Sequence, residues 1–171
     1  KKQTIAGLFH DISTPVFKHC IDFMNGDHQT QESTEELTTY MIKNSKEIMD
    51  LLERDNIKLD EVDDYHIYPI ADNDTPKLSA DRLEYTFANG LYLKKVWNVQ
   101  KIKKIYSNIE IQINEDGVRE LGFKDKKIAE EFIEGASQLW SLWASNEDKL
   151  AMQFLADTVR KMSEENFLTK K

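Results

Sequence analysis

The chain has 171 residues, of which 40% are hydrophobic and 32% charged, with six glycines and three prolines. This composition is typical of a globular, helix-rich protein and not of a disordered segment. The formal net charge of -8 argues against nonspecific binding to nucleic acid or to anionic membranes, since both depend on positive potential. No apolar run approaches the roughly 18 residues that a membrane-spanning helix needs. A single cysteine, Cys20, excludes an internal disulfide and Cys-rich zinc sites, so we expect a cytoplasmic protein whose metal ligands would be His and carboxylate.

The length suits a single compact domain, because two domains of ordinary size need a longer chain. We therefore expect one domain over residues 1–171. The first residue is Lys1 and not Met, so we expect this domain to be a fragment of a longer protein.

The first predicted helix ends close to the start of the chain. Residues 5–9 are apolar enough to form its last buried turns, which places His10-Asp11 at its end. Thr14-Pro15 is typical of an N-cap followed by proline in the first helical position, so a second helix is predicted to begin there. Apolar residues at helical spacing continue this helix until Asn25-Gly26-Asp27 ends the pattern.

A polar loop and a longer helical region follow. Residues 27–32 are predicted to form the loop, and Ser33 with Glu36 three residues later matches a capping box. An apolar stripe then continues to about Arg54 as one long or broken helix. Residues 55–78 lose the helical period, so we expect a short helical turn and then a long loop, a feature that is often functional.

The next two helices are predicted from one cap and from apolar spacing. Ser79 is expected to cap a helix that carries Asp81 in its first turn and that Asn89-Gly90 weakens. A further helix is expected over residues 96–106.

A β-hairpin and two helices complete the expected fold. Isoleucines alternate with polar residues over 109–113, Glu115-Asp116-Gly117 turns the chain, and the alternation then resumes, which predicts a hairpin over residues 109–123. Two amphipathic patterns over residues 124–165 predict two closing helices. The predicted fold class is therefore all-α with a small β-hairpin.

Four short stretches resemble the HD-domain superfamily of metal-dependent phosphohydrolases. They are His10-Asp11, Pro15-Val16-Phe17-Lys18-His19, Gln31-Glu32-Ser33 and Ser79-Ala80-Asp81-Arg82-Leu83-Glu84-Tyr85. The resemblance is greatest to the branch of deoxynucleoside triphosphate triphosphohydrolases, and it covers an HD core of about residues 1–95. It implies an HD-type helical domain in which the hairpin is an insertion.

The resemblance also implies a site for a divalent metal ion. Family members hold the ion with a first His, then an adjacent His-Asp pair, then a distant Asp, so the implied ligands here are His10, Asp11 and Asp81. None of the nine residues before His10 is His, so either an upstream segment carries the first ligand or the site is incomplete. Ser13 stands where the family commonly has Gly, which alters the helix junction without removing a ligand. These ligands do not distinguish Mn, Mg, Fe, Ni and Zn.

Other side chains near these ligands are candidates for acid–base chemistry and phosphate binding. The resemblance implies that His19 could contact phosphate or donate a proton. His28 and Glu32 could each supply a proton to the leaving group, although all three side chains also suit packing, capping or a solvated surface. Arg82 and Lys18 could hold phosphate oxygens, Arg82 bidentately and Lys18 as a point charge, with exposed helix charges as the alternative.

These residues lead to the hypothesis of a phosphohydrolase that acts on a phosphorylated small molecule, with a nucleotide as the favoured substrate. A divalent ion with open positions lowers the pKa of a bound water, which is then expected to attack phosphorus. The first alternative is a non-catalytic HD-fold module that senses nucleotides or binds another protein, which the missing His and Ser13 favour. A second alternative is a cyclic-nucleotide phosphodiesterase. Either the hairpin or the Trp-bearing helix could form a homo-oligomer contact.

Overall fold

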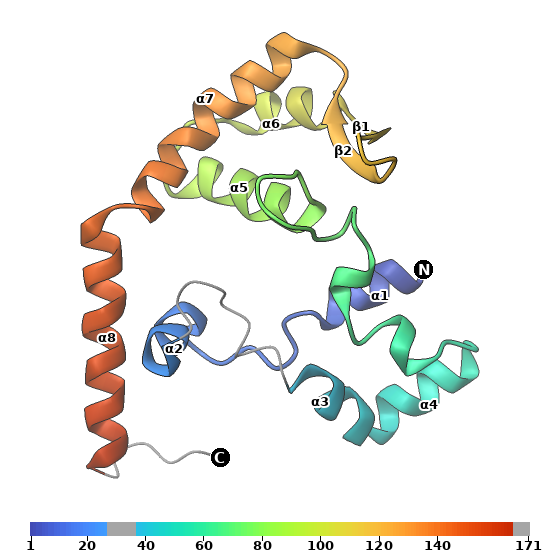
Figure 1. Ribbon diagram of the computed structural model, residues 1–171, viewed down its shortest axis with the longest axis vertical. Coiled ribbons are helices and arrows are strands. Elements are labelled where there is room, and N and C mark those ends of the chain that lie inside the picture. Colours follow the sequence, from blue (N-terminus) through green and yellow to red (C-terminus); the bar gives the residue numbers. More distant parts are fainter. Residues whose placement is uncertain (27–36, 166–171) are drawn as a thin grey trace. The chain divides into compact units, whose positions relative to one another are not determined.

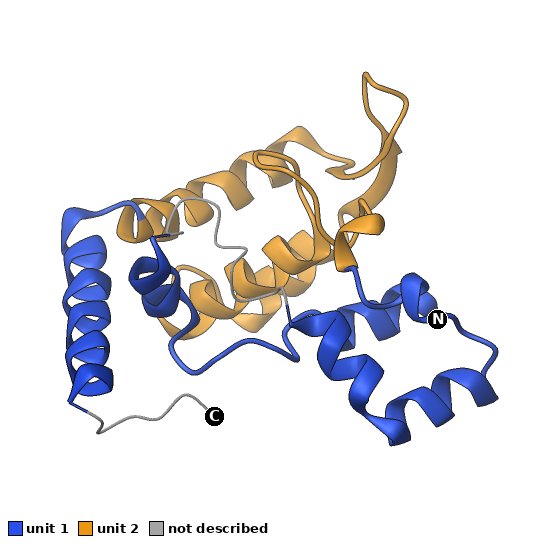
Figure 2. Cartoon of the chain, turned by 60° about the horizontal axis from the view of Figure 1, so that its bottom comes forward, with its two compact units in different colours: residues 1–64, 144–171 blue, residues 65–143 orange. Residues whose placement is uncertain are grey.

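The computed structural model describes residues 1–26 and 37–165. The chain divides into two compact units, which Figure 2 colours separately. Unit 1 comprises residues 1–64 and 144–171, and unit 2 comprises residues 65–143. The described residues are mostly helical and contain one two-stranded antiparallel sheet, which confirms the predicted all-α fold with a small hairpin. The prediction of a single HD-type domain stays a prediction, and each unit is described below by itself.

One part of unit 1 is a small cluster of helices near the N-terminus. It contains α1 (Lys2–Phe9), α3 (Thr38–Asn44), α4 (Lys46–Arg54) and the short 3-10 helix η1 (Leu59–Glu61). Their inner faces bury the apolar side chains of Ala6, Ile42, Leu52, Ile57 and Val62. The predicted helix that ends near Arg54 is broken at Ser45, whose hydroxyl accepts a hydrogen bond from the Ile48 amide at 3.4 Å and caps α4. This cluster positions the end of α1, where His10 follows Phe9.

The second part of unit 1 is the pair formed by α2 (Lys18–Asn25) and α8 (Asn146–Glu164). The predicted start of α2 at Thr14-Pro15 is wrong, because the helix begins only at Lys18. Phe17 precedes it in the left-handed region, with φ of 64°. Gly26 ends α2 at φ of 77°, as its place in the sequence predicted. The predicted loop at 27–32 and the capping box of Ser33 and Glu36 lie outside the described residues.

Unit 2 places three helices side by side with the hairpin near one end of α7 (Figure 1). These elements are α5 (Ala80–Tyr92), α6 (Val99–Tyr106), β1 (Ile109–Ile113), β2 (Arg119–Phe123) and α7 (Lys126–Trp143), after a 3-10 turn η2 (Tyr65–Ile67). Residues 55–78 form two short 3-10 turns and a loop, whereas one short helical turn and a loop were predicted. The α6 helix begins three residues later than predicted, because Asn98 caps it by accepting from the Lys101 amide at 2.8 Å.

Trp97 occupies the centre of the unit 2 core. Its ring stacks on Phe132 with centroids 5.6 Å apart, and it meets Phe87 edge-on at 5.7 Å. A Cβ atom added to Gly90 on α5 would lie 2.3 Å from the Trp97 ring, and one added to Gly135 on α7 would lie equally close. The prediction that Asn89-Gly90 weakens α5 is therefore wrong in its consequence. The helix continues to Tyr92, and Gly90 leaves room for the indole.

The hairpin has the predicted position and a simple register. Ile109 pairs with Phe123, Ile111 with Leu121 and Ile113 with Arg119. Gly117 turns the chain at φ of 74°, a conformation that favours glycine. Ile109, Leu121 and Phe123 pack against the core of unit 2. In the part of the chain that the structure describes, no helix has the length and apolar character required to cross a membrane.

Candidate metal centre

His10 lies at the C-terminal end of α1, where local backbone fixes its ring. The Nδ1 atom lies 2.7 Å from the carbonyl oxygen of Gly7. When Nδ1 carries the proton and donates to this carbonyl, Nε2 keeps the lone pair that binds a metal ion. Such a backbone contact is the usual way in which a ligating histidine is oriented.

The Asp11 carboxylate lies beside Nε2 of the His10 ring. Its Oδ2 atom lies 3.2 Å from His10 Nε2, while Oδ1 accepts a hydrogen bond from the Thr14 hydroxyl at 2.8 Å and lies 3.6 Å from Lys18 Nζ. Burial raises the pKa of the Asp11 carboxyl, but the Thr14 hydroxyl, His10 and Lys18 outweigh it and hold the pKa below its usual value. Asp11 is therefore an anion at neutral pH, the state that a metal ligand requires.

The His10 and Asp11 donor atoms fit a shared divalent ion. Two ligand atoms that bind one ion at about 2.1 Å and at right angles lie roughly 3 Å apart. The 3.2 Å between His10 Nε2 and Asp11 Oδ2 is close to this value. Within either unit, however, no three His, Cys, Asp or Glu side chains among the described residues are grouped to hold a metal ion. The pair by itself therefore offers two ligand atoms to an ion.

Asp81 lies in the first turn of α5, as predicted. Ser79 caps this helix by accepting a hydrogen bond from the Arg82 amide at 3.1 Å, and the Asp81 amide donates to the Ala71 carbonyl at 3.1 Å. Asp81 belongs to unit 2, whereas His10 and Asp11 belong to unit 1. The set of three ligands stays a prediction.

The Arg82 guanidinium holds the loop that precedes α5. Its Nη1 donates to the Asn73 side-chain oxygen at 3.1 Å and to the Lys77 carbonyl, and its Nη2 donates to the Asn73 carbonyl at 3.0 Å. The side chain is only 18% exposed, and Nη2 lies 3.9 Å from Asp72. Arg82 is therefore a clamp on this loop, and its predicted contact with phosphate would have to use its remaining N–H groups.

A second pair of titratable side chains lies beside Asp81 in unit 2. His66 Nε2 lies 3.3 Å from Asp72 Oδ2. Burial raises the pKa of Tyr65, and the negative charges of Asp81 and Asp72 raise it further, so both carboxylates act on the same phenol. No sequence signal indicates this pair, because a loop without a helical or strand period contains no spacing that pairs residues 66 and 72.

The remaining predicted site residues have the following positions. Lys18 begins α2 beside Asp11, with its side chain 22% exposed. His19 on the same helix is exposed, and its Nδ1 lies 3.5 Å from Asp22, a fully buried carboxylate. His28 and Glu32 lie outside the described residues. The roles of these four residues stay predictions.

Comparisons with known proteins assign no function. No protein-family model matches the chain. Half of the chain, 86 residues, is 31% identical to a protein named "Uncharacterized protein YdhJ" from Bacillus subtilis (strain 168). This stretch covers 26% of that relative, so the chain spans about a quarter of the relative's length. No solved structure matches the chain.

Proposed function

We propose that this chain is part of an HD-type, metal-dependent phosphohydrolase that acts on a phosphorylated small molecule, with a nucleotide as the favoured substrate. The observation that carries the proposal is the geometry of His10 and Asp11, whose ring nitrogen and carboxylate oxygen lie 3.2 Å apart. The contact between His10 Nδ1 and the Gly7 carbonyl supports it, because it leaves Nε2 facing Asp11. The Thr14 hydroxyl and Lys18 also support it, because both favour the charged form of the Asp11 carboxylate.

In this proposal, His10 and Asp11 hold the ion together with Asp81. A divalent ion bound there would supply Lewis acidity and lower the pKa of a bound water. Lys18, at 3.6 Å from Asp11, places a positive charge where a phosphate would approach the pair. Arg82 contributes through the N–H groups that the loop leaves unused, and His19 remains a candidate proton donor.

One observation favours the alternative of a non-catalytic module that binds nucleotide or another protein. Three hydrogen bonds of the Arg82 guanidinium go to the loop of its own unit, which leaves it fewer donors for a phosphate. A module of this kind binds its ligand without turnover. Hydrolysis therefore separates the two functions.

The test is hydrolysis of a panel of nucleoside mono-, di- and triphosphates by the full-length protein with Mn, Mg, Fe, Ni or Zn. We expect turnover of at least one substrate with at least one metal, and a loss of more than a hundredfold in Asp11→Asn and His10→Ala. Asp116→Asn is the matched control, because Asp116 is an exposed carboxylate in the hairpin turn and its loss should leave turnover unchanged. Nucleotide binding without turnover under every metal would support the module instead.

A further inference from the structure

The hairpin leaves one edge of β1 without a partner strand. The Asn114 amide donates to the Val118 carbonyl at 2.9 Å, and the Lys124 amide donates to the Asn108 carbonyl at 3.0 Å. Hydrogen-bonded pairs alternate with non-hydrogen-bonded pairs in an antiparallel ladder. With this register, the N–H and C=O groups of Ile109, Ile111 and Ile113 point away from β2. Among the described residues, no other donor or acceptor is paired with these outward groups.

Apolar side chains beside this edge are exposed. Ile111 is 56% exposed, Ile113 63% and Tyr106 68%. A groove of about 700 Å³ lies between β1, α5 and α6, and most of its wall is apolar. An exposed strand with an apolar face and an unpaired edge is a template for the addition of another strand.

The sequence of β1 is complementary to itself. Its residues are Ile-Glu-Ile-Gln-Ile, centred on Ile111. In an antiparallel pair of two such strands, Ile111 faces its own copy, Ile109 faces Ile113, and Glu110 faces Gln112. The outward N–H and C=O groups of the three isoleucines then form hydrogen-bonded pairs across the new contact. No charged residue lies directly opposite a like charge.

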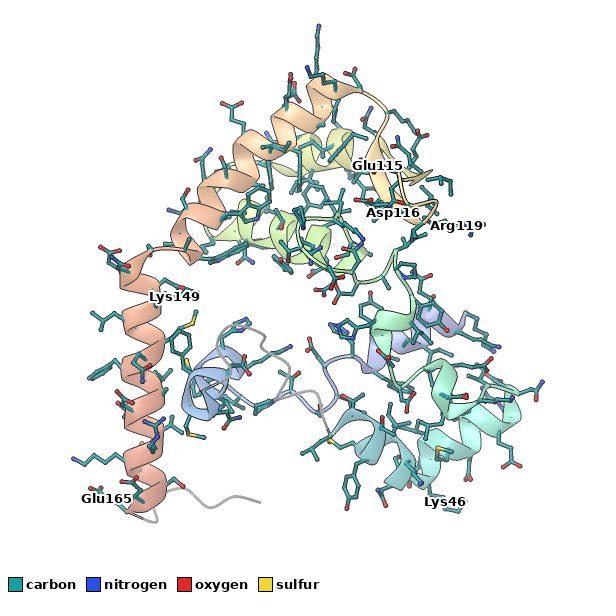
Figure 3. The ribbon with its side chains drawn as sticks, in the orientation of Figure 1. Lys46, Glu115, Asp116, Arg119, Lys149 and Glu165 are labelled. Carbon is teal, nitrogen blue, oxygen red and sulfur yellow. The ribbon has the colours of Figure 1, made fainter. Side chains whose placement is uncertain are left out.

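Charges around the groove also match such a pairing. Glu84 lines the groove, and Arg119 lies on the face of the hairpin that carries the isoleucines. In the part of the chain described here, neither Glu84 nor Arg119 has an ion-pair partner. Figure 3 labels Arg119 at the hairpin together with Glu115 and Asp116. In a four-stranded sheet of order β2, β1, β1, β2, Arg119 of the second copy lies on the same face as Glu84 of the first.

We propose that β1 is the interface between two copies of this chain, which join β1 to β1 antiparallel about Ile111 to form a four-stranded sheet. This proposal is independent of the proposed function, because it uses no residue of the candidate metal centre. The contact is short, so we expect a dimer that dissociates on dilution.

The first test is sedimentation of the full chain over a concentration series. The wild type should pass from monomer to dimer. Ile111→Lys places two ammonium groups opposite each other, so this variant should stay monomeric at every concentration. Gln112→Lys is the matched control, because its ammonium faces Glu110 of the second copy and should preserve or tighten the dimer. A wild type that is always monomeric, or an Ile111→Lys variant that dimerises as well as the wild type, would overturn the proposal.

The second test measures the register and does not depend on stability. In a Cys20→Ser background, Ile111→Cys should form a disulfide-linked dimer on mild oxidation, because the two Cα atoms of a hydrogen-bonded pair are about 5.5 Å apart. Ile113→Cys should not, because four residues of offset separate its two copies by about 14 Å along the strands. Equal cross-linking of both variants, or of neither, would contradict this interface.

Discussion

After α1, two local contacts determine which ring nitrogen of His10 carries a proton and stabilise the charge of the Asp11 carboxylate. The Gly7 carbonyl accepts from the His10 ring, and the Thr14 hydroxyl donates to Asp11. The place of Thr14 before Pro15 predicted a helix N-cap, but Thr14 caps no helix. Its hydroxyl instead stabilises the charge of Asp11. Asp11 and Thr14 are three positions apart in a turn and not in a helix, which brings the hydroxyl back to the carboxylate.

Thr14→Val removes the hydroxyl while keeping the shape of the side chain. We expect the pKa of Asp11 to rise, because the carboxylate loses a donor that favours its charged form. Stability at neutral pH should fall by about 0.5 kcal/mol, since the Asp11 side chain is 54% exposed and water replaces much of the lost bond. A carboxyl-detected NMR titration measures the pKa, and urea denaturation measures the stability.

The pH dependence has a definite sign. Because folding lowers the pKa of Asp11, its contribution to stability is full above the ordinary value of 3.8 and disappears as the pH falls through the lower folded value. The difference between wild type and Thr14→Val should therefore vanish in strong acid. Thr39→Val, which removes a hydroxyl donor from Asp63, is the control and should not change the pKa of Asp11. An unchanged pKa in Thr14→Val would contradict this account.

A second prediction at this scale concerns the glycine beneath Trp97. Helix propensity alone favours Gly90→Ala by about 1 kcal/mol, but the new Cβ would overlap the Trp97 ring. We expect a net loss of about 2 kcal/mol in the free energy of unfolding, measured by chemical denaturation.

Gly122→Ala is the matched control for this steric effect. The atoms nearest to its new Cβ belong to the end of the flexible Gln112 side chain on the exposed hairpin, so the cost should stay within about 0.5 kcal/mol. In Gly90→Ala, the further substitution Trp97→Leu should restore part of the lost stability relative to the sum of the single changes. Additive effects of the two substitutions on the free energy of unfolding would show that overlap with the Trp97 indole does not cause the loss of stability in Gly90→Ala.

At the scale of elements, the start of α5 and the loop before it form one structural piece. Ser79 is buried and caps the helix, while Arg82 from the first turn reaches back to Asn73 and Lys77. This arrangement fixes the backbone from which Asp81 projects. Arg82 therefore positions a predicted ligand whether or not it also touches phosphate.

Arg82→Lys retains the charge, but the lysine side chain is shorter and has a single nitrogen. It cannot reach the three acceptors that bind two separate nitrogens of the guanidinium. We expect the unfolding free energy to fall by about 1–2 kcal/mol and amide hydrogen exchange to accelerate over residues 72–78. Arg119→Lys is the control, because Arg119 is exposed and its exchange for Lys should change stability by less than about 0.5 kcal/mol. Unchanged amide hydrogen exchange over residues 72–78 would show that the Arg82 hydrogen bonds do not order this loop.

Apolar periodicity predicted the helices and the hairpin that pack on a single face. The α7 and α8 helices and the strands β1 and β2 all have the expected positions, because burial of one face imposes the period of 3.6 or 2 on the sequence. A break in the helical region that ends near Arg54 was one of two predicted outcomes, and the structure places it at Ser45. In these elements, local preference and tertiary packing act in the same direction.

Tertiary contacts decided the features that the sequence misstated or left open. Gly90 weakens a helix in isolation, yet Trp97 requires it. Residues 66 and 72 are six apart in an irregular loop, so their contact follows from the path of the loop and not from any repeat. The candidate site was predictable where its residues are adjacent, as in His10 and Asp11, and not where a loop brings them together.

At the scale of the whole molecule, the proposed phosphohydrolase acts through a metal ion. The proposed ligands are His10 and Asp11, which lie 3.2 Å apart after α1, and Asp81 in the first turn of α5. Metal binding by the intact protein is therefore the property on which the proposed function depends.

Metal binding is measured by calorimetric titration of the full-length protein with Mn, Mg, Fe, Ni and Zn. We expect saturable binding of at least one ion, abolished in His10→Ala and Asp11→Asn, weakened in Asp81→Asn, and unchanged in Asp116→Asn. Failure of every ion to bind, or binding that persists equally in Asp11→Asn, would contradict the proposed function.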